Sequence, residues 1–171
     1  MLYQKLPIEF YLRDVLEVAP ELPGKRLVLL RDQVPEIYHI TEVEAYRGGE
    51  DLACHASKGM TPRTEVMFRE GGILYMYFVY GMHWMMNIVT APAGIPQAVL
   101  IRGLDKVNGP GRLTRHLGLN RTFNGESLIF SERIWLEDAE LQPEIHTSPR
   151  IGIDYAGEPW VSKKWRYWIM M

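Results

Sequence analysis

The sequence has very little cysteine. Cys54 is the single one, so no internal disulfide can form and a disulfide-stapled scaffold is excluded. We expect a reducing location, the cytoplasm, near the nucleoid if the source is bacterial. The first ten residues lack the pattern of a signal peptide. Long hydrophobic runs are also missing: residues 73–90 are interrupted by glycine, histidine and asparagine, which predicts strands and no membrane association.

An excess of charge of one sign is lacking too. The 171 residues carry 19 Lys and Arg against 21 Asp and Glu, a formal net charge of −2. This excludes a protein that is basic over its whole surface. Residues 56–121 nevertheless hold 8 basic and 3 acidic side chains, whereas both flanking segments are acidic. A focused nucleic-acid site remains compatible with this distribution, and its few phosphate contacts predict a shallow salt dependence of binding.

No linker, repeat or low-complexity tract divides the chain, which predicts one domain over residues 1–171. Helical spacing of apolar residues predicts a helix over 8–19, and Gly109-Pro110-Gly111 predicts the start of another. Because the strand signals cluster and do not alternate with helices, we expect a mixed α+β fold with mainly antiparallel strands. The predicted strands are 27–30, 37–46, 73–80, 84–90 and 99–104, followed by a short strand or turn within 128–137, an acidic loop up to Pro149 and a basic, aromatic tail over 163–168.

One predicted strand places two carboxylates and a tyrosine on the same face. Strand alternation puts Glu42, Glu44 and Tyr46 on one side. A solvated strand face explains this pattern, since glutamate is mostly exposed. A carboxylate base beside an aromatic platform, as in enzymes that cleave glycosidic bonds, explains it as well.

The aromatic hairpin over residues 73–90 predicts mostly core side chains, but its tip differs. Tyr80 precedes Gly81, where a hairpin presents a large side chain to a partner, and such wedges unstack base steps in DNA. Asn87 lies in an apolar strand and must find hydrogen-bond partners if it is buried. It is therefore either a network residue or a reader of a polar ligand.

Cys54 and His55 are adjacent, and neighbours seldom aim their side chains at each other. This favours a small buried thiol over a nucleophile, and His55 alone is compatible with a surface loop. The five histidines show no metal-ligand spacing. This spacing gives a structural or catalytic zinc site little support.

Several motifs occur in order along nearly the whole chain: Thr41–Tyr46, His55, Thr61-Pro62-Arg63, Met67-Phe68, Tyr75–Met82, Asn87, Arg102, Gly109–Leu113 and Arg150–Ile153. Taken together, they resemble the 3-methyladenine DNA glycosylase family of the alkyladenine type. The resemblance implies a single compact domain of mixed α+β class, with a curved, barrel-like, mainly antiparallel sheet and flanking helices. It also implies a monomer that acts on double-stranded DNA containing damaged purines.

The resemblance further implies the roles of individual residues. Glu44 would deprotonate a water that attacks C1′ of the deoxyribose, and Arg102 would hold that water and tune the carboxylate. Tyr46 and Tyr77 would sandwich the flipped base, with His55 along one edge.

Three more roles follow from the same resemblance. Tyr80 would fill the gap left in the duplex, with Met82 packed beside it. Asn87 would lie where the 2-amino group of a normal guanine clashes. The expected reaction is hydrolysis of the N-glycosidic bond of 3-methyladenine, 7-methylguanine or hypoxanthine. Because no lysine matches a position beside Glu44, the product would be an abasic site. The resemblance implies neither a metal nor an organic cofactor.

The sequence departs from the family pattern at Thr64, where asparagine usually follows Thr-Pro-Arg, and in a shorter 55–61 loop and a longer turn between Asn87 and Arg102. Two alternatives stay open. One is a catalytically weak nucleic-acid binding paralogue, and the other is a sugar glycosidase that uses the paired carboxylates.

Overall fold

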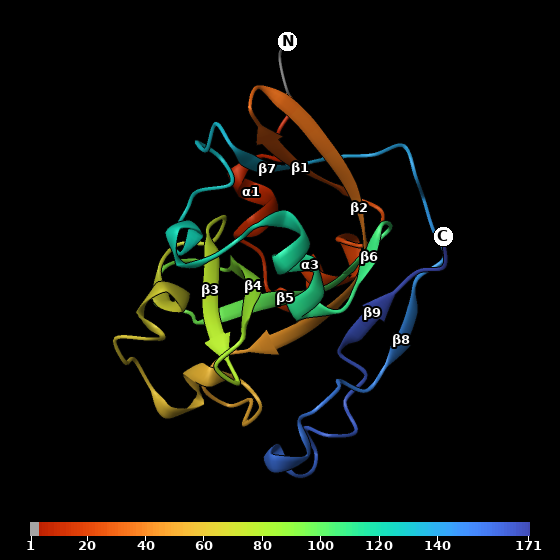
Figure 1. Cartoon of the computed structure of the whole chain (residues 1–171). Coiled ribbons are helices and arrows are strands. Elements are labelled where there is room, and N and C mark those ends of the chain that lie inside the picture. The colour runs from red at the N-terminus through yellow and green to blue at the C-terminus, as the bar shows by residue number, and fades with distance from the viewer. Residues whose placement is uncertain (1–3) are drawn as a thin grey trace.

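The protein is built on an antiparallel sheet, and the computed structural model describes residues 4–171. Within that range the sheet has nine strands, and six of them follow the order β3-β4-β5-β2-β1-β7 (Figure 1). β6 pairs with β5, β9 with β2, and β8 with β9. The strands are β1 (Arg26–Arg31), β2 (Val34–Arg47), β3 (Leu74–Val79), β4 (His83–Thr90), β5 (Gln97–Leu104), β6 (Val107–Asn108), β7 (Ile134–Glu137), β8 (His146–Ser148) and β9 (Arg166–Trp168).

Short helices flank this sheet. The hydroxyl of Thr114 in α3 donates to the carbonyl oxygen of Trp84 at 2.6 Å, which ties this helix to β4. The predicted helix start at Gly109 is confirmed, and Gly118 caps the C-terminal end of the helix with a φ of 68°, which suits glycine. The helices are α1 (Ile8–Tyr11), α2 (Val15–Val18), α3 (Pro110–Leu117) and the 3₁₀ turns η1 (Ala19–Glu21), η2 (His55–Lys58), η3 (Glu65–Phe68), η4 (Arg121–Phe123) and η5 (Asp154–Ala156).

The prediction of one helix over 8–19 is wrong, because the chain breaks between α1 and α2. Asp14 adopts extended backbone angles there and accepts a hydrogen bond from the backbone N–H of Leu16, so it caps the start of α2. Its carboxylate also accepts hydrogen bonds from Arg47. A local cap and a distant ion pair thus interrupt the helix that the spacing of apolar residues predicts.

The predicted central strands are confirmed, with changes at their ends. A two-residue turn joins β1 and β2, and both of its residues, Asp32 and Gln33, have positive φ, as a tight hairpin of this kind requires. β8 and β9 are corrections to the predicted loop and tail. Each is only three residues long and takes its stability from pairing, β9 against β2 and β8 against β9.

The sheet is not closed into a barrel, so the barrel-like arrangement is not confirmed. Its outer strands, β3 and β7, pair with one neighbour each. Other parts of the chain cover their free edges: Leu74 exchanges backbone hydrogen bonds with Gly125 and Glu126, and Leu6 donates to the carbonyl of Leu136. Because covered edges need no further strand, the sheet is stable without closure.

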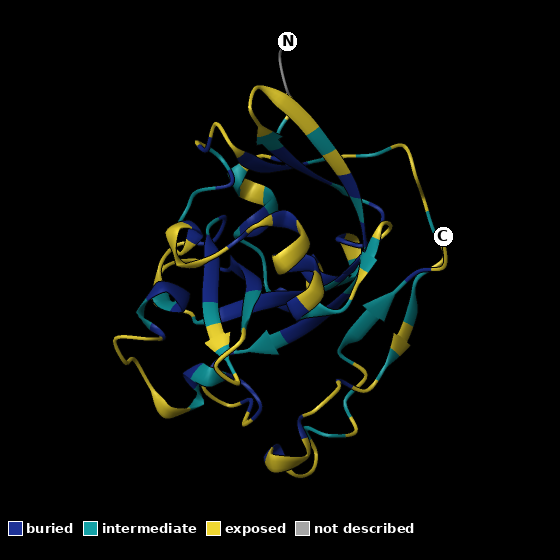
Figure 2. Cartoon of the chain, in the orientation of Figure 1, coloured by how far each residue is buried: buried dark blue, intermediate teal, exposed yellow. Residues whose placement is uncertain are grey.

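Three apolar clusters stabilise this arrangement, and the two with most residues bear on the site (Figure 2). The larger one fills the space between α1, α2, α3 and the central strands. The smaller one contains Cys54, Met67 and Tyr75 and lies beneath the site described below. Cys54 is buried, as predicted, and burial raises the pKa of its thiol to about 11.

Candidate active site

A cavity of about 50 Å³ opens beside the end of β2. Strands β2, β3, β4 and β5, the turns η2 and η3, and the C-terminal turn η5 all contribute to its walls. Tyr75 and Tyr77 face the same side because they are two residues apart on β3. The wall side chains include Tyr46, His55, Met67, Tyr75, Tyr77, Asn87 and Tyr155. The four residues predicted to contact a base therefore do meet around one cavity.

Glu44 lies in β2 next to this cavity, and its side chain has 0% solvent exposure. The hydroxyl of Tyr46 donates to its Oε1 at 2.9 Å, and the backbone N–H of Ile151 donates to its Oε2 at 2.7 Å. Burial raises the pKa of Glu44, while the charge of Arg102 and these two hydrogen bonds partly lower it. An oriented carboxylate with a raised pKa suits a general base.

Arg102 reaches the same carboxylate from β5. Its Nη1 lies 3.6 Å from Oε1 of Glu44, and its Nε donates to Oε1 of Glu42 at 3.1 Å. The two glutamates predicted to share a strand face thus flank one guanidinium. Since Glu44 is completely buried, the interpretation of a solvated strand face is wrong for this residue.

The aromatic walls contact one another and two arginines. The rings of His55 and Tyr77 meet edge-on with centroids 4.5 Å apart. The guanidinium of Arg63 lies 5.4 Å from the ring centroid of Tyr77, and that of Arg150 lies 4.9 Å from the ring centroid of Tyr46. These contacts hold both tyrosine rings in place.

His55 is held in its neutral form. Burial, followed by the charges of Arg63 and Lys58, lowers the pKa of His55 to about 4. Its Nδ1 lies 3.2 Å from the hydroxyl of Tyr75. The cavity wall therefore carries no histidine charge at neutral pH.

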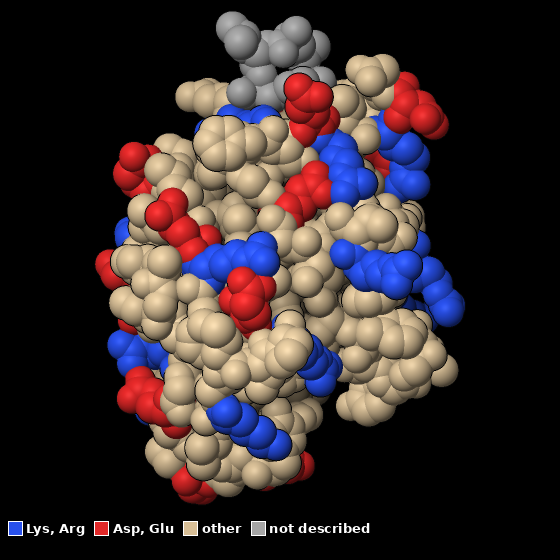
Figure 3. All heavy atoms as spheres, turned by 90° about the vertical axis from the view of Figure 1, so that its left-hand side faces the viewer, with Lys and Arg blue, Asp and Glu red and all other residues tan. Residues whose placement is uncertain are grey.

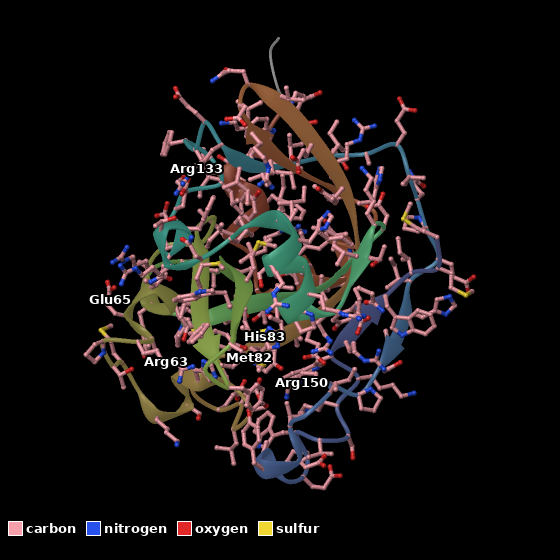
Figure 4. The ribbon with its side chains drawn as sticks, viewed as in Figure 1. Arg63, Glu65, Met82, His83, Arg133 and Arg150 are labelled. Atoms are coloured by element: carbon pink, nitrogen blue, oxygen red, sulfur yellow. The ribbon has the colours of Figure 1, made fainter. Side chains whose placement is uncertain are left out.

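The tip of the β3–β4 hairpin projects two apolar side chains into solvent. Tyr80 is 89% exposed and Met82 is 60% exposed. Tyr80 and Gly81 have φ angles of 54° and 63°, and the N–H of Met82 donates to the carbonyl of Val79, which is the geometry of a tight turn with two left-handed residues. In Figure 4, Arg63 and Arg150 lie on opposite sides of Met82 in this view.

Asn87 is 4% exposed and faces the cavity from β4. Its Nδ2 donates to the carbonyl oxygen of Tyr75, the residue opposite it on β3, at 3.2 Å. Asn87 is therefore a satisfied network residue that also lines the site. Thr64, a departure from the family pattern, is buried, and its hydroxyl donates to the carbonyl of Gly59.

The C-terminal segment contributes residues that the sequence analysis did not assign to the site. Tyr155 lines the cavity, and its hydroxyl donates to the carbonyl of Ala53 at 2.9 Å. Ile151 holds Glu44 through its backbone. Ile151 belongs to the Arg150–Ile153 motif and Tyr155 follows it, so this motif was the sequence signal for both residues. The hydrogen bond from Ile151 could not be predicted, because a backbone N–H is present in almost every residue type.

Charges of both signs are mixed on the face shown in Figure 3. Arg69 pairs with Glu65 and Arg133 pairs with Glu126 on exposed surfaces. Pairing of this kind neutralises part of the basic excess of the middle segment.

Comparison with known proteins identifies the family. A model of the methylpurine-DNA glycosylase family matches residues 9–171. The chain belongs to this family. Similar proteins, each provisionally named a 3-methyladenine DNA glycosylase, come from Myxococcus xanthus (43% identical, covering 96% of this chain and 89% of the relative), Legionella pneumophila (42%, 97% and 94%) and Borreliella burgdorferi (41%, 94% and 93%).

The resemblance inferred from the motifs is thus confirmed. The protein is a DNA glycosylase, a hydrolase that acts on N-glycosyl bonds in base-excision repair. In residues 4–171 no helix has the length and apolar character needed to cross a membrane. Across the same residues no three His, Cys, Asp or Glu side chains gather as a metal site.

Proposed function

We propose that this glycosylase removes alkylated or deaminated purines that have been flipped out of double-stranded DNA, and that it leaves an abasic site. 3-Methyladenine, 7-methylguanine and hypoxanthine are the proposed substrates. The observation that carries this proposal is the Glu44 carboxylate, fully buried and hydrogen-bonded to Tyr46, whose ring lines an aromatic cavity.

In the proposed reaction, Glu44 accepts a proton from a water molecule as the water oxygen attacks C1′ of the deoxyribose. The N-glycosidic bond breaks, and its electron pair leaves with the base. For a positively charged 3-methyladenine the departing base becomes neutral, so one general base suffices. Neutral hypoxanthine is a poorer leaving group and reacts more slowly. Arg102, 3.6 Å from Glu44, helps to orient the water.

Base recognition rests on aromatic faces. Tyr46 and Tyr77 stack on the extrahelical purine, and aromatic faces attract cations by about 0.5 to 2 kcal/mol. The neutral state of His55 supports this assignment, because a charged histidine would repel a cationic base. Asn87 discriminates against the 2-amino group of normal guanine.

DNA distortion is assigned to the hairpin tip. Tyr80 enters the space vacated by the flipped nucleotide, with Met82 beside it, and its exposure supports this role. The cavity walls named above include no lysine, which favours simple hydrolysis over a Schiff-base mechanism with strand cleavage.

The test uses a duplex oligonucleotide with one hypoxanthine or ethenoadenine. Incubation with the protein followed by hot alkali cleaves the strand at any abasic site. We expect cleavage with alkali and none without it, and no cleavage with Glu44→Gln. Binding without cleavage by the wild type would indicate a non-catalytic paralogue. Inactivity on every lesion together with hydrolysis of an aryl glycoside would indicate a sugar glycosidase.

A further inference from the structure

Glu42 lies between two arginines from two different strands. Nε of Arg102 donates to its Oε1 at 3.1 Å, and Nη1 of Arg166 donates to the same oxygen at 3.2 Å. The exposed fractions of the three side chains are 17% for Glu42, 15% for Arg102 and 23% for Arg166. In such a partly buried setting, ion pairs are stronger than at an open surface.

An irregularity in the sheet creates this contact. Glu42 in β2 pairs with Gly103 in β5, but the next residue, Val43, pairs with Ile101, so Arg102 is an extra residue with no partner in register. Bulges of this kind re-aim a side chain and occur next to active sites. Gly103 is needed for it, since a Cβ there would lie 2.8 Å from the side-chain oxygen of Thr41.

The contact determines how close Arg102 comes to Glu44. Glu42 accepts a hydrogen bond from Nε of Arg102. Nη1 of the same guanidinium then lies 3.6 Å from Oε1 of Glu44, a distance too long for a hydrogen bond. Oε1 accepts its hydrogen bond from Tyr46 instead. Glu44 is therefore ion-paired with Arg102 at 3.6 Å but accepts no direct hydrogen bond from the guanidinium.

We propose that Glu42 is a positioning residue that holds Arg102 away from Glu44, so that the carboxylate of Glu44 stays free to accept a proton from water. This inference rests on the proposed role of Glu44 as the general base. Without Glu42, the guanidinium moves onto Glu44 and forms the hydrogen-bonded pair that is absent in the native site.

The charged and titratable groups around Glu44 determine the pKa of its carboxyl group. Within residues 4–171, five titratable or charged groups interact with it: Arg102 from β5, Arg150 from the C-terminal segment, Tyr46 from its own strand, Tyr77 from β3 and Tyr155 from η5. Loss of the negative charge of Glu42 lowers the pKa of Glu44, because a like charge is removed. Closer approach of Arg102 lowers the same pKa further. Both effects make Glu44 a weaker base.

Glu42→Gln tests the proposal, because glutamine keeps the shape and an acceptor oxygen but removes the charge. The measurement is the single-turnover rate of hypoxanthine excision between pH 4.5 and 8, together with lesion-DNA affinity. We expect the rate at neutral pH to fall about three- to tenfold. The acid limb of the profile should shift down by about 0.5 to 1 pH unit, with affinity unchanged.

Glu36→Gln is the matched control. Glu36 lies in the same strand and also pairs with an arginine, since Nε of Arg31 donates to it at 2.8 Å. It contributes to no wall of the cavity. Loss of an ion pair from β2 can lower the unfolding midpoint of either variant. A purely structural effect of this kind does not shift the pH profile of the excision rate, so Glu36→Gln should keep the wild-type profile.

An unchanged acid limb and rate for folded Glu42→Gln would overturn the proposal. If that variant does not fold, Glu42→Asp replaces it, because aspartate keeps the charge but its shorter side chain withdraws the carboxylate from Arg102. We expect a smaller loss of rate for Glu42→Asp than for Glu42→Gln. A wild-type rate for Glu42→Asp would overturn the proposal. Failure of the proposed function is distinguishable, because then the wild type itself excises no base or Glu44→Gln retains full activity.

Discussion

Arg150 and Asp51 form a fully buried ion pair. Nη1 of Arg150 donates to Oδ2 of Asp51 at 2.6 Å and Nη2 donates to Oδ1 at 2.9 Å, and both side chains are 0% exposed. The same Nη1 also donates to the carbonyl of Ala45, and the guanidinium lies over the ring of Tyr46. One side chain thus connects the C-terminal segment, the loop after β2 and β2 itself.

Asp51→Asn should destabilise the protein. The change leaves Arg150 charged and buried without the carboxylate that binds it directly, and breaking a buried pair costs about 3 to 5 kcal/mol in the free energy of unfolding. Urea denaturation measures this loss. Glu50→Gln, which removes a largely exposed partner of Arg47, is the control and should remain close to wild type. Equal stabilities of the two variants would contradict the energetic role of the pair.

Glu44→Gln should abolish excision while lesion-DNA binding persists, with a loss of at least about 10² in single-turnover rate, in the range typical of general-base removal. It should also raise the free energy of unfolding at pH 7. Because burial raises the folded pKa of Glu44, its ionisation opposes folding increasingly as the pH rises through that pKa. Normal turnover by this variant would refute the assignment, and fluorescence anisotropy checks the binding.

His55 should make the protein sensitive to acid. Its folded pKa of about 4 lies below the value of about 6.5 expected for an unfolded chain. Between these values the unfolded chain binds a proton that the folded chain does not, so the free energy of unfolding falls as the pH falls. In His55→Gln the slope of unfolding free energy against pH should be smaller over this window. An identical slope in both proteins would show that His55 is not responsible.

Tyr80→Ala should weaken binding to a lesion in duplex DNA much more than to the same lesion in a single strand, because only the duplex has a gap for the wedge to fill. Gel shift titration of both substrates gives the ratio. Phe130→Ala is a suitable control, since Phe130 is 84% exposed and lies outside the β3–β4 hairpin. Equal losses on the two substrates would remove the wedge role from Tyr80.

Much of the site could be predicted because its signals are local. Alternation along one strand placed Glu44 and Tyr46 together, and their side chains do form a hydrogen bond. The glycine of the hairpin located Tyr80 at an exposed tip. The predicted helix start at Gly109 rested on equally local residues.

The missed features depend on long-range contacts. Asp14 breaks the N-terminal helix with a cap that Arg47 reinforces from β2. The three-residue strands β8 and β9 have no periodicity to detect. Ile151 reaches Glu44 through a backbone N–H, which any residue type supplies. Apart from the local bond between Asp14 and Leu16, these contacts join residues too far apart to be seen in a short window of sequence.

The bond between Ile151 and Glu44 joins residues 107 positions apart. Long-range contacts of this kind form slowly, because the ends of a long loop must first meet. During refolding, the carboxylate therefore stays hydrated until the last part of the chain docks beside β2. Recovery of enzymatic activity should lag behind recovery of the sheet signal in circular dichroism, so competence for repair is the final property that this chain acquires as it folds.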